Sequence, residues 1–259
     1  MNYSSTVRQI YQGRMLEYDL KECETSYVSE KLCQEMEHWT SQQPILINAP
    51  TGSGKSRFVL YDLADYAEKH GRWILVLSNR IALNLQQKMD LCRKRNLPIV
   101  GTKILADCQE FGNVVLCTYQ SSRELVNTLL QQYNWYQQNL YRGEFSITIP
   151  PYPYSPPQFV VFDEAHFFGS DAVFNPQTEA ILEQILTSFP YAIRIYMSAT
   201  PTDVKPVIAE KEYGLLERML MTNPSMKLYQ LAGIFRIIEY YFNADYDHVN
   251  LNFFMNGNQ

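Results

Sequence analysis

The sequence predicts a three-layer α/β domain with a mostly parallel central sheet. Short apolar runs have the length of buried strands, segments with helical spacing separate these runs, and polar residues follow several of them. Parallel strands need a crossover connection, which a helix supplies. The chain has 259 residues, of which 46% are hydrophobic and 19% charged. This composition is typical of a packed globular domain and excludes disorder for most of the chain.

The first elements are expected before residue 50. Apolar residues at four-residue spacing in residues 27–39 predict a helix, and we expect residues 1–40 to form an N-terminal helical segment. The continuous apolar run Ile45–Asn48 predicts the first clear strand. Because the run has no polar face, this strand should be buried on both sides.

Helices and strands then alternate along the chain. Helices are expected at about 54–70, 81–95, 123–132 and 178–188, and strands at 73–77, 114–117, 159–162 and 193–197. A further helix is expected to begin near Pro201. We place the main lobe at residues 41–230 and a linker at residues 231–259.

One segment interrupts this alternation. Residues 133–157 are rich in tyrosine, and five of the eight residues in Pro150–Pro157 are proline. Proline fixes φ and removes a hydrogen-bond donor, so the segment is expected to be an extended surface insertion. Both a functional loop and a loop without a special role are compatible with this pattern.

Charge and cysteine content limit the partners. The chain has 22 basic and 27 acidic residues and a net charge of −5, so nucleic acid would have to bind to a local patch. The five cysteines form no C-x-x-C pair, which argues against a disulfide framework and a structural zinc site. No apolar run approaches the roughly 18 residues of a membrane span. We therefore expect a cytoplasmic protein with no structural metal.

A glycine-rich sequence follows the first predicted strand. Ala49–Ser56 reads APTGSGKS and matches the phosphate-loop pattern, with alanine in place of its first glycine. Gly52 and Gly54 would let successive N–H groups face phosphate oxygens. Lys55 would reach the β- and γ-phosphates, and the Ser56 hydroxyl would bind Mg²⁺. The alternative is an ordinary turn between a strand and a helix. The candidate nucleotide-binding residues are Pro50, Thr51, Gly52, Ser53, Gly54, Lys55 and Ser56.

Two acidic residues follow the strand predicted at 159–162. Asp163 can hold Mg²⁺ at the end of that strand, while Glu164 can orient and deprotonate an attacking water. The alternative is that the pair only caps the next helix. Ser198 and Thr200 follow the strand predicted at 193–197, and their hydroxyls could bond to Glu164 or His166 and sense the state of the nucleotide.

Together these motifs resemble the first RecA-like lobe of a superfamily-two DEAD/DEAH-box helicase or translocase, which has a P-loop fold. Ala49–Ser56 resembles motif I, Asp163–His166 a DEAH box and Ser198–Thr200 motif III. Leu77–Leu83 resembles motif Ia, and Thr118–Gln120 resembles the short motif after the fourth strand of such lobes.

The resemblance implies that the chain binds ATP with Mg²⁺ and acts on DNA or RNA. It implies nucleic-acid contacts at Arg80, Thr118 and Gln120, and it places Gln34 either as an adenine contact or as an exposed helix residue. The candidate catalytic residues are Lys55, Asp163, Glu164 and His166.

The resemblance also implies a second RecA-like lobe. No motif of such a lobe follows Thr200 in this sequence. We expect that lobe beyond residue 259 or in another chain. The expected function is Mg²⁺-dependent ATP hydrolysis coupled to movement on nucleic acid. Two alternatives stay open: the motor subunit of a restriction or defence complex, and a nucleotide-binding interaction module without motor activity.

Overall fold

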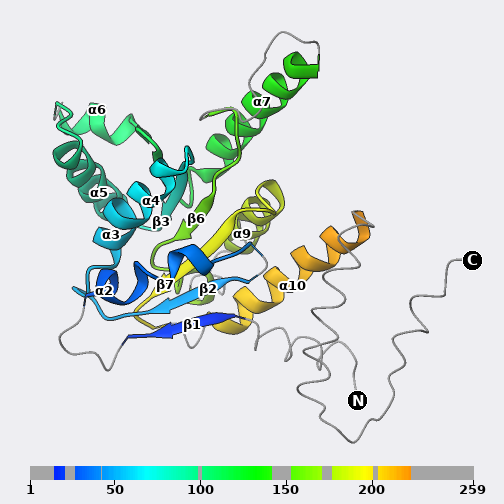
Figure 1. Ribbon diagram of the computed structural model, residues 1–259, viewed down its shortest axis with the longest axis horizontal. Helices are drawn as coiled ribbons and strands as arrows, with labels where there is room; N and C mark the ends of the chain where they lie inside the picture. Colours follow the sequence, from blue (N-terminus) through cyan, green and yellow to red (C-terminus); the bar gives the residue numbers. More distant parts are fainter. Residues whose placement is uncertain are drawn as a thin grey trace, which may run out of the picture.

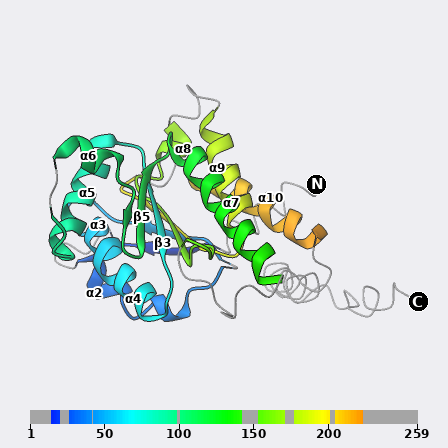
Figure 2. The same cartoon turned by 90° about the horizontal axis from the view of Figure 1, so that it is seen from above.

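One seven-stranded sheet organises the chain, for which a computed structural model describes residues 15–20, 27–41, 43–98, 101–141, 153–170, 177–200 and 204–222. The strand order is β1-β2-β7-β6-β3-β5-β4. Every strand pair is parallel except that of β4 with β5. Helices cover both faces of the sheet (Figures 1 and 2). The expected three-layer, mostly parallel α/β architecture is confirmed.

The strands are short and mostly apolar. They are β1 Leu16–Asp19, β2 Ile45–Asn48, β3 Ile74–Ser78, β4 Glu110–Phe111, β5 Val114–Thr118, β6 Phe159–Phe162 and β7 Ile193–Ser198. Every residue of β3 and β6 is buried. Because helices lie on both faces, neither strand needs a polar side, and this is why continuous apolar runs predicted them.

The helices divide between the two faces (Figure 2). One face carries α2 Val28–Leu32, a 3₁₀ turn at Met36–His38, α3 Lys55–Arg57, η2 Phe58–Leu63, α4 Ala64–Lys69, α5 Ile81–Lys94 and α6 Thr102–Asp107. The other face carries α7 Ser122–Tyr141, α8 Phe167–Ser170, α9 Gln177–Ser188 and α10 Lys205–Thr222.

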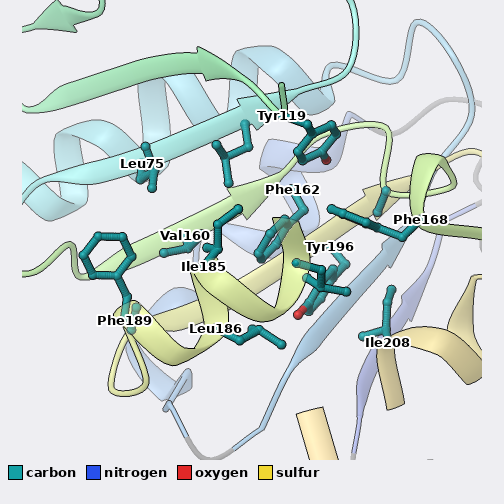
Figure 3. Close-up of a cluster of buried hydrophobic side chains, with 14 of the residues drawn as sticks. Leu75, Tyr119, Val160, Phe162, Phe168, Ile185, Leu186, Phe189, Tyr196 and Ile208 are labelled. Atoms are coloured by element: carbon teal, nitrogen blue, oxygen red, sulfur yellow. The ribbon is translucent and has the colours of Figure 1, made fainter. Parts of the chain in front are cut away.

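The core consists of two apolar clusters, one on each face of the sheet. Neighbouring strand residues alternate between them, so that Val76 belongs to the cluster beneath α2–α5 and Leu75 to the cluster beneath α7–α10. Aromatic rings fill much of the second cluster (Figure 3). Phe162 of β6 stacks on Tyr196 of β7 with ring centroids 4.6 Å apart.

The helix that follows β2 is continuous from Lys55 to Lys69, close to the expected range of 54–70. Its middle part, Phe58–Leu63, is π-helical. Such segments are rare and frequently lie at functional sites.

The N-terminal part of the chain differs from the helical segment expected for residues 1–40. Leu16–Asp19 form β1, which pairs in parallel with β2 and becomes an edge strand of the sheet. Its four residues include Glu17 and Asp19, so it lacks the apolar run that identifies the inner strands. The helix expected at 27–39 is also shorter, because α2 ends at Leu32 and a 3₁₀ turn follows.

The insertion expected at 133–157 is partly helical. α7 continues to Tyr141, and Tyr136 is buried on its core-facing side. After the segment 142–152, which lies outside the described residues, Tyr154 stacks on Tyr136 with centroids 5.4 Å apart. Ser155 O accepts a hydrogen bond of 2.9 Å from Trp73 Nε1. The expectation of an extended surface loop was therefore wrong for residues 133–141, which are helical, whereas residues 153–157 are non-helical but pack against the core.

The C-terminal expectations are only partly described. α10 begins at Lys205, and the predicted helix start at Pro201 and the predicted linker at 231–259 lie outside the described residues. β4, α6 and α8 were not predicted, because none of them combines its short length with the continuous apolar run that marks the short inner strands. Within the described ranges, no helix has the length and apolar character needed to cross a membrane.

Candidate active site

One edge of the sheet gathers all the motifs that the sequence singled out. β2, β7, β6, β3 and β5 are mutually parallel, so their carboxyl ends meet at this edge. β7 separates β2 from β6. The segments that leave these strands are Ala49–Ser56, Ser198–Thr200, Asp163–His166, Asn79–Arg80 and Thr118–Gln120.

The Ala49–Ser56 loop has two residues in the left-handed region. Gly52 and Gly54 each have φ of +84°, a conformation that glycine adopts without steric cost. A Cβ atom on Gly54 would also lie 3.2 Å from Cδ1 of Tyr27. The start of α2 therefore packs on this loop, and Val28 N donates a hydrogen bond of 3.0 Å to Ser53 O. The sequence did not predict this contact with Tyr27.

Lys55 lies at the start of α3 and is 8% exposed. Its ammonium group donates to Ala49 O at 2.7 Å and to Pro50 O at 2.9 Å. Burial lowers the pKa of Lys55, while the nearby carboxylates of Glu164 and Asp163 act in the opposite direction. The loop thus holds a buried cation whose present partners are neutral carbonyls, which a phosphate group can replace.

Asp163 follows β6 and is 2% exposed. Its Oδ2 accepts a hydrogen bond of 2.8 Å from Nε2 of Gln87, and its Oδ1 accepts one of 3.0 Å from the N–H of Glu164. Burial and then the charge of Glu164 raise the pKa of Asp163 to about 6, against the lowering effects of Lys55, Gln87 and the Glu164 amide. At neutral pH this buried carboxyl group is mostly ionised, as a magnesium ligand must be.

Glu164 has φ of +56°, which is rare for a residue with a side chain. Such strained positions cost about 1–3 kcal/mol and cluster at functional sites. Its carboxylate Oε2 lies 3.2 Å from Nδ1 of His166, and both side chains remain partly exposed. The next amide, Ala165 N, donates to Met197 O at 2.8 Å and fixes the loop to β7.

The end of β7 joins the two loops through main-chain contacts. Ser198 O accepts a hydrogen bond of 3.2 Å from Ala49 N, on the opposite side of β7 from Ala165. The Ser198 hydroxyl oxygen accepts the Thr200 N–H at 3.0 Å. The backbone of β7 thus connects the two loops, while the side-chain bonds expected from Ser198 and Thr200 to Glu164 or His166 stay a prediction.

The candidate nucleic-acid residues lie farther along the same edge. Arg80 is exposed at the N-cap of α5, and Gln120 is exposed after β5. Thr118 Oγ1 lies 2.9 Å from Ser121 Oγ within a tight turn. A cavity of about 300 Å³ opens beside Thr118 and Gln120. By contrast, Gln34 is exposed in the turn after α2.

Two buried residues near Asp163 were not predicted. Gln87 lies on α5, two turns after Arg80, and Tyr119 lies between Thr118 and Gln120. The Tyr119 hydroxyl donates a hydrogen bond of 2.8 Å to Asp163 O. The only sequence signals are that Tyr119 lies inside the segment Thr118–Gln120 and that Gln87 lies on the helix that follows Arg80.

The sequence matches the family "Type III restriction enzyme, res subunit" over residues 12–203. The chain belongs to this family. As a res-subunit family member, it contains the first, DEAD/DEAH-like ATP-binding lobe of superfamily two, which confirms the family resemblance predicted from the sequence. The match begins before β1, so the edge strand is part of the family domain.

No curated protein matches this chain significantly. A solved structure titled "The crystal structure of T4 UvsW" is similar at 17% sequence identity, with a TM-score of 0.39. The similarity covers 81% of this chain and 38% of the T4 UvsW chain, so this chain spans well under half of that protein.

Proposed function

We propose that the chain is the ATP-binding lobe of a nucleic-acid-dependent motor, which hydrolyses ATP with Mg²⁺ and moves on DNA or RNA together with a second lobe. One observation carries the proposal: the loop with Lys55 and the loop with Asp163 and Glu164 follow the strands on either side of β7, and both loops are hydrogen-bonded to the end of β7. A cation on a glycine-rich loop opposite two carboxylates is the arrangement that phosphate hydrolysis with a metal requires.

The residues present suit a magnesium nucleotide. The N–H groups of Gly52–Ser56 and the ammonium group of Lys55 would bind the phosphates, once Lys55 leaves the carbonyls of Ala49 and Pro50. Ser56 and Asp163 would hold Mg²⁺, because each offers an oxygen ligand at the ends of α3 and β6. When bound, the ion neutralises charge on the phosphate oxygens.

Glu164 is the proposed general base. Its carboxylate is 28% exposed, so water can reach it, whereas Asp163 is buried. Glu164 would accept a proton while the water oxygen bonds to the terminal phosphorus and the bond to the ADP oxygen breaks. His166, 3.2 Å from Glu164 Oε2, would orient that carboxylate. An arginine from a second lobe adds roughly 10³–10⁵ in rate, so the lobe alone should turn over slowly.

Arg80, Thr118 and Gln120 are the proposed contacts to the nucleic-acid backbone. All three lie at the carboxyl ends of β3 and β5, on the edge that carries the nucleotide residues, and Thr118 is the last residue of β5. Arg80 and Gln120 are exposed, as contacts to a polymer must be, and Arg80 supplies positive charge on a chain whose net charge is −5.

ATP turnover tests this function. Phosphate release is measured with single-stranded DNA, duplex DNA, single-stranded RNA, duplex RNA and no nucleic acid. We expect at least one nucleic acid to raise the rate. We also expect Glu164→Gln to lower the rate by about 10²–10⁴ while ATP still binds, and Lys55→Ala to abolish turnover. Normal turnover by the Glu164→Gln protein would show that another group is the base.

The family name favours a second, narrower candidate, the motor subunit of a restriction complex. Such a motor acts on duplex DNA, and stimulation by duplex DNA without strand separation would support it. If no nucleic acid changes the rate, the third alternative, an interaction module that binds nucleotide without motor activity, becomes the better explanation.

A further inference from the structure

Asp163 is held by hydrogen bonds from both helical layers. From the α5 side, Gln87 Nε2 donates to its carboxylate at 2.8 Å. From the α7 side, the Tyr119 hydroxyl donates to its carbonyl oxygen at 2.8 Å. Both donors are buried, Gln87 at 2% exposure and Tyr119 at 0%. A single residue at the candidate metal position thus connects two segments that carry candidate nucleic-acid contacts.

Tyr119 fixes the peptide that joins Asp163 to Glu164. The carbonyl oxygen of this peptide accepts the Tyr119 hydroxyl, and its N–H donates to Asp163 Oδ1 at 3.0 Å. The peptide plane is therefore held at both ends, immediately before the strained φ of +56° at Glu164. A peptide freed at its oxygen can rotate and relieve that strain, which would move the Glu164 carboxylate.

Tyr119 also contacts the segment after the DEAH residues. Its ring stacks on Phe167 with centroids 4.9 Å apart and an interplanar angle of 6°, and it meets Phe168 edge-on at 4.9 Å. Figure 3 shows Tyr119 beside Phe162 and Phe168 at the end of the strands. Its own backbone is tied to the end of β3, because Tyr119 N donates to Ser78 O at 2.9 Å.

Gln87 has the features of a positioning residue more than of a packing residue. Its Oε1 is buried without a hydrogen-bond donor among the described residues, so the amide is only half satisfied. A buried polar atom without a hydrogen-bond partner lowers the stability of the fold. For packing alone, an apolar side chain of the same size would be more favourable. Its one described hydrogen bond goes to Asp163.

We propose that Gln87 and Tyr119 transmit nucleic-acid binding to the Asp163–Glu164 pair. This inference rests on the proposed function. Arg80 begins the helix that carries Gln87, and Thr118 and Gln120 flank Tyr119. A backbone contact at either segment moves a donor that is already bonded to Asp163. Nucleic acid then sets the position of the metal ligand and of the base without touching either residue.

Two variants remove the donors with little change in shape, and a third is a matched control. Tyr119→Phe deletes one hydroxyl and keeps the ring stack on Phe167, and Gln87→Met keeps the length of the side chain. The control is Tyr196→Phe, because Tyr196 is also buried in the same cluster and stacks on Phe162, while its hydroxyl donates to Glu212 at 2.6 Å.

The experiment measures four quantities in the full chain: the Kd of a fluorescent Mg-ATP analogue, the Kd of a labelled nucleic acid, and ATP turnover with and without saturating nucleic acid. We expect both Kd values to stay within about twofold of the unaltered protein in Tyr119→Phe and Gln87→Met. Their stimulated turnover should fall by about tenfold to a hundredfold, and unstimulated turnover by less. Tyr196→Phe should keep the full stimulation ratio.

Each outcome separates the inference from the function on which it rests. Unchanged stimulation ratios in Tyr119→Phe and Gln87→Met overturn the inference and leave the motor function standing. An equal loss in Tyr196→Phe also overturns it, because the effect would then be one of packing. If no nucleic acid stimulates the unaltered protein, the motor function itself fails, and transmission with it. If Gln87→Met does not fold, Tyr119→Phe alone decides.

Discussion

The carboxyl edge of the sheet has two halves, one around β2, β7 and β6 and the other around β3 and β5. They differ in how strongly burial and hydrogen bonds hold their candidate residues in place. Around β2, β7 and β6, Lys55 and Asp163 are buried and each accepts or donates at least two hydrogen bonds. Around β3 and β5, Arg80 and Gln120 are exposed to solvent. Residues that stabilise a transition state must be held in place before it forms, whereas residues that bind a polymer can become ordered on it.

This difference assigns separate tasks to the two halves. Changes near β2 and β6 should alter nucleotide binding, hydrolysis and stability, because those residues are buried and mutually bonded. Changes near β3 and β5 should alter nucleic-acid affinity and leave the fold unaffected. Gln87 and Tyr119 are the exceptions, since they belong to the second half by sequence and contact Asp163 in the first.

The largest expected loss of stability lies away from both halves. Arg194, near the start of β7, donates through Nε to both carboxylate oxygens of Glu212, at 2.7 and 2.8 Å, and both side chains are buried. Glu212→Ala would leave a buried guanidinium without its counter-charge and should lower the free energy of unfolding by about 3–5 kcal/mol. Urea denaturation measures this change.

The matched control is an exposed ion pair between α9 and α10, the helix that carries Glu212. Arg218 and Glu183 form an ion pair of 2.8 Å whose side chains are about half exposed. Glu183→Ala should therefore cost less than about 1 kcal/mol. Neither change should alter ATP affinity. A large loss of ATP affinity in Glu212→Ala, at temperatures where the protein is folded, would contradict this. It would show that the buried pair of Arg194 and Glu212 serves nucleotide binding as well as stability.

A smaller effect is expected from the titration of Asp163. Its pKa is raised from 3.8 to about 6 in the folded protein. The unfolded chain therefore loses this proton first as pH rises, so stability falls between roughly pH 4 and pH 6 and stays lower above pH 6, by about 2–3 kcal/mol. Asp163→Asn removes this penalty and should raise the melting temperature of the ligand-free protein at pH 7.5.

The gain in Asp163→Asn should shrink as pH falls towards 4 and disappear near roughly pH 3, where the unaltered carboxyl group is protonated in both the folded and the unfolded state. The same variant should lose the thermal stabilisation that Mg-ATP provides, since the candidate metal ligand is gone. A ligand-free variant that is less stable than the unaltered protein at pH 7.5 would contradict the burial of an ionised Asp163.

Alanine substitutions at the two loop glycines should lower the free energy of unfolding by unequal amounts, and these effects are smaller than those above. Both have φ of +84°, so Gly52→Ala should cost about 1–2 kcal/mol through the left-handed backbone alone. Gly54→Ala should cost more, because its Cβ would lie 3.2 Å from the Tyr27 ring, whereas nothing lies within 4 Å of a Cβ at Gly52. Thermal unfolding of both variants with and without Tyr27→Ala measures the excess, which should vanish when the ring is absent.

The smallest effect is expected at Arg80. Arg80→Ala should weaken nucleic-acid binding severalfold and reduce the slope of log Kd against log salt by about 1, as for the loss of one phosphate contact. ATP affinity and melting temperature should not change, because Arg80 is exposed. Fluorescence anisotropy over a salt series makes the measurement. An unchanged slope would remove Arg80 from the nucleic-acid interface.

The inner strands and the two loops with chemistry were predictable because their physics is local. β3 and β6 are apolar throughout, and the left-handed backbone at Gly52 and Gly54 demands glycine. β1 was not predictable, since a short edge strand with acidic residues resembles a loop. The role of Gln87 was hidden because its partner, Asp163, is brought near only by the pairing of β3 with β6.

An equilibrium titration with a fluorescent ATP analogue measures whether the edge between β2 and β6 binds a magnesium nucleotide, as proposed. We expect saturable, Mg²⁺-dependent binding by the unaltered protein and by Glu164→Gln, and loss of that binding in Lys55→Ala. No binding by the unaltered protein, or equal binding by Lys55→Ala, would contradict it.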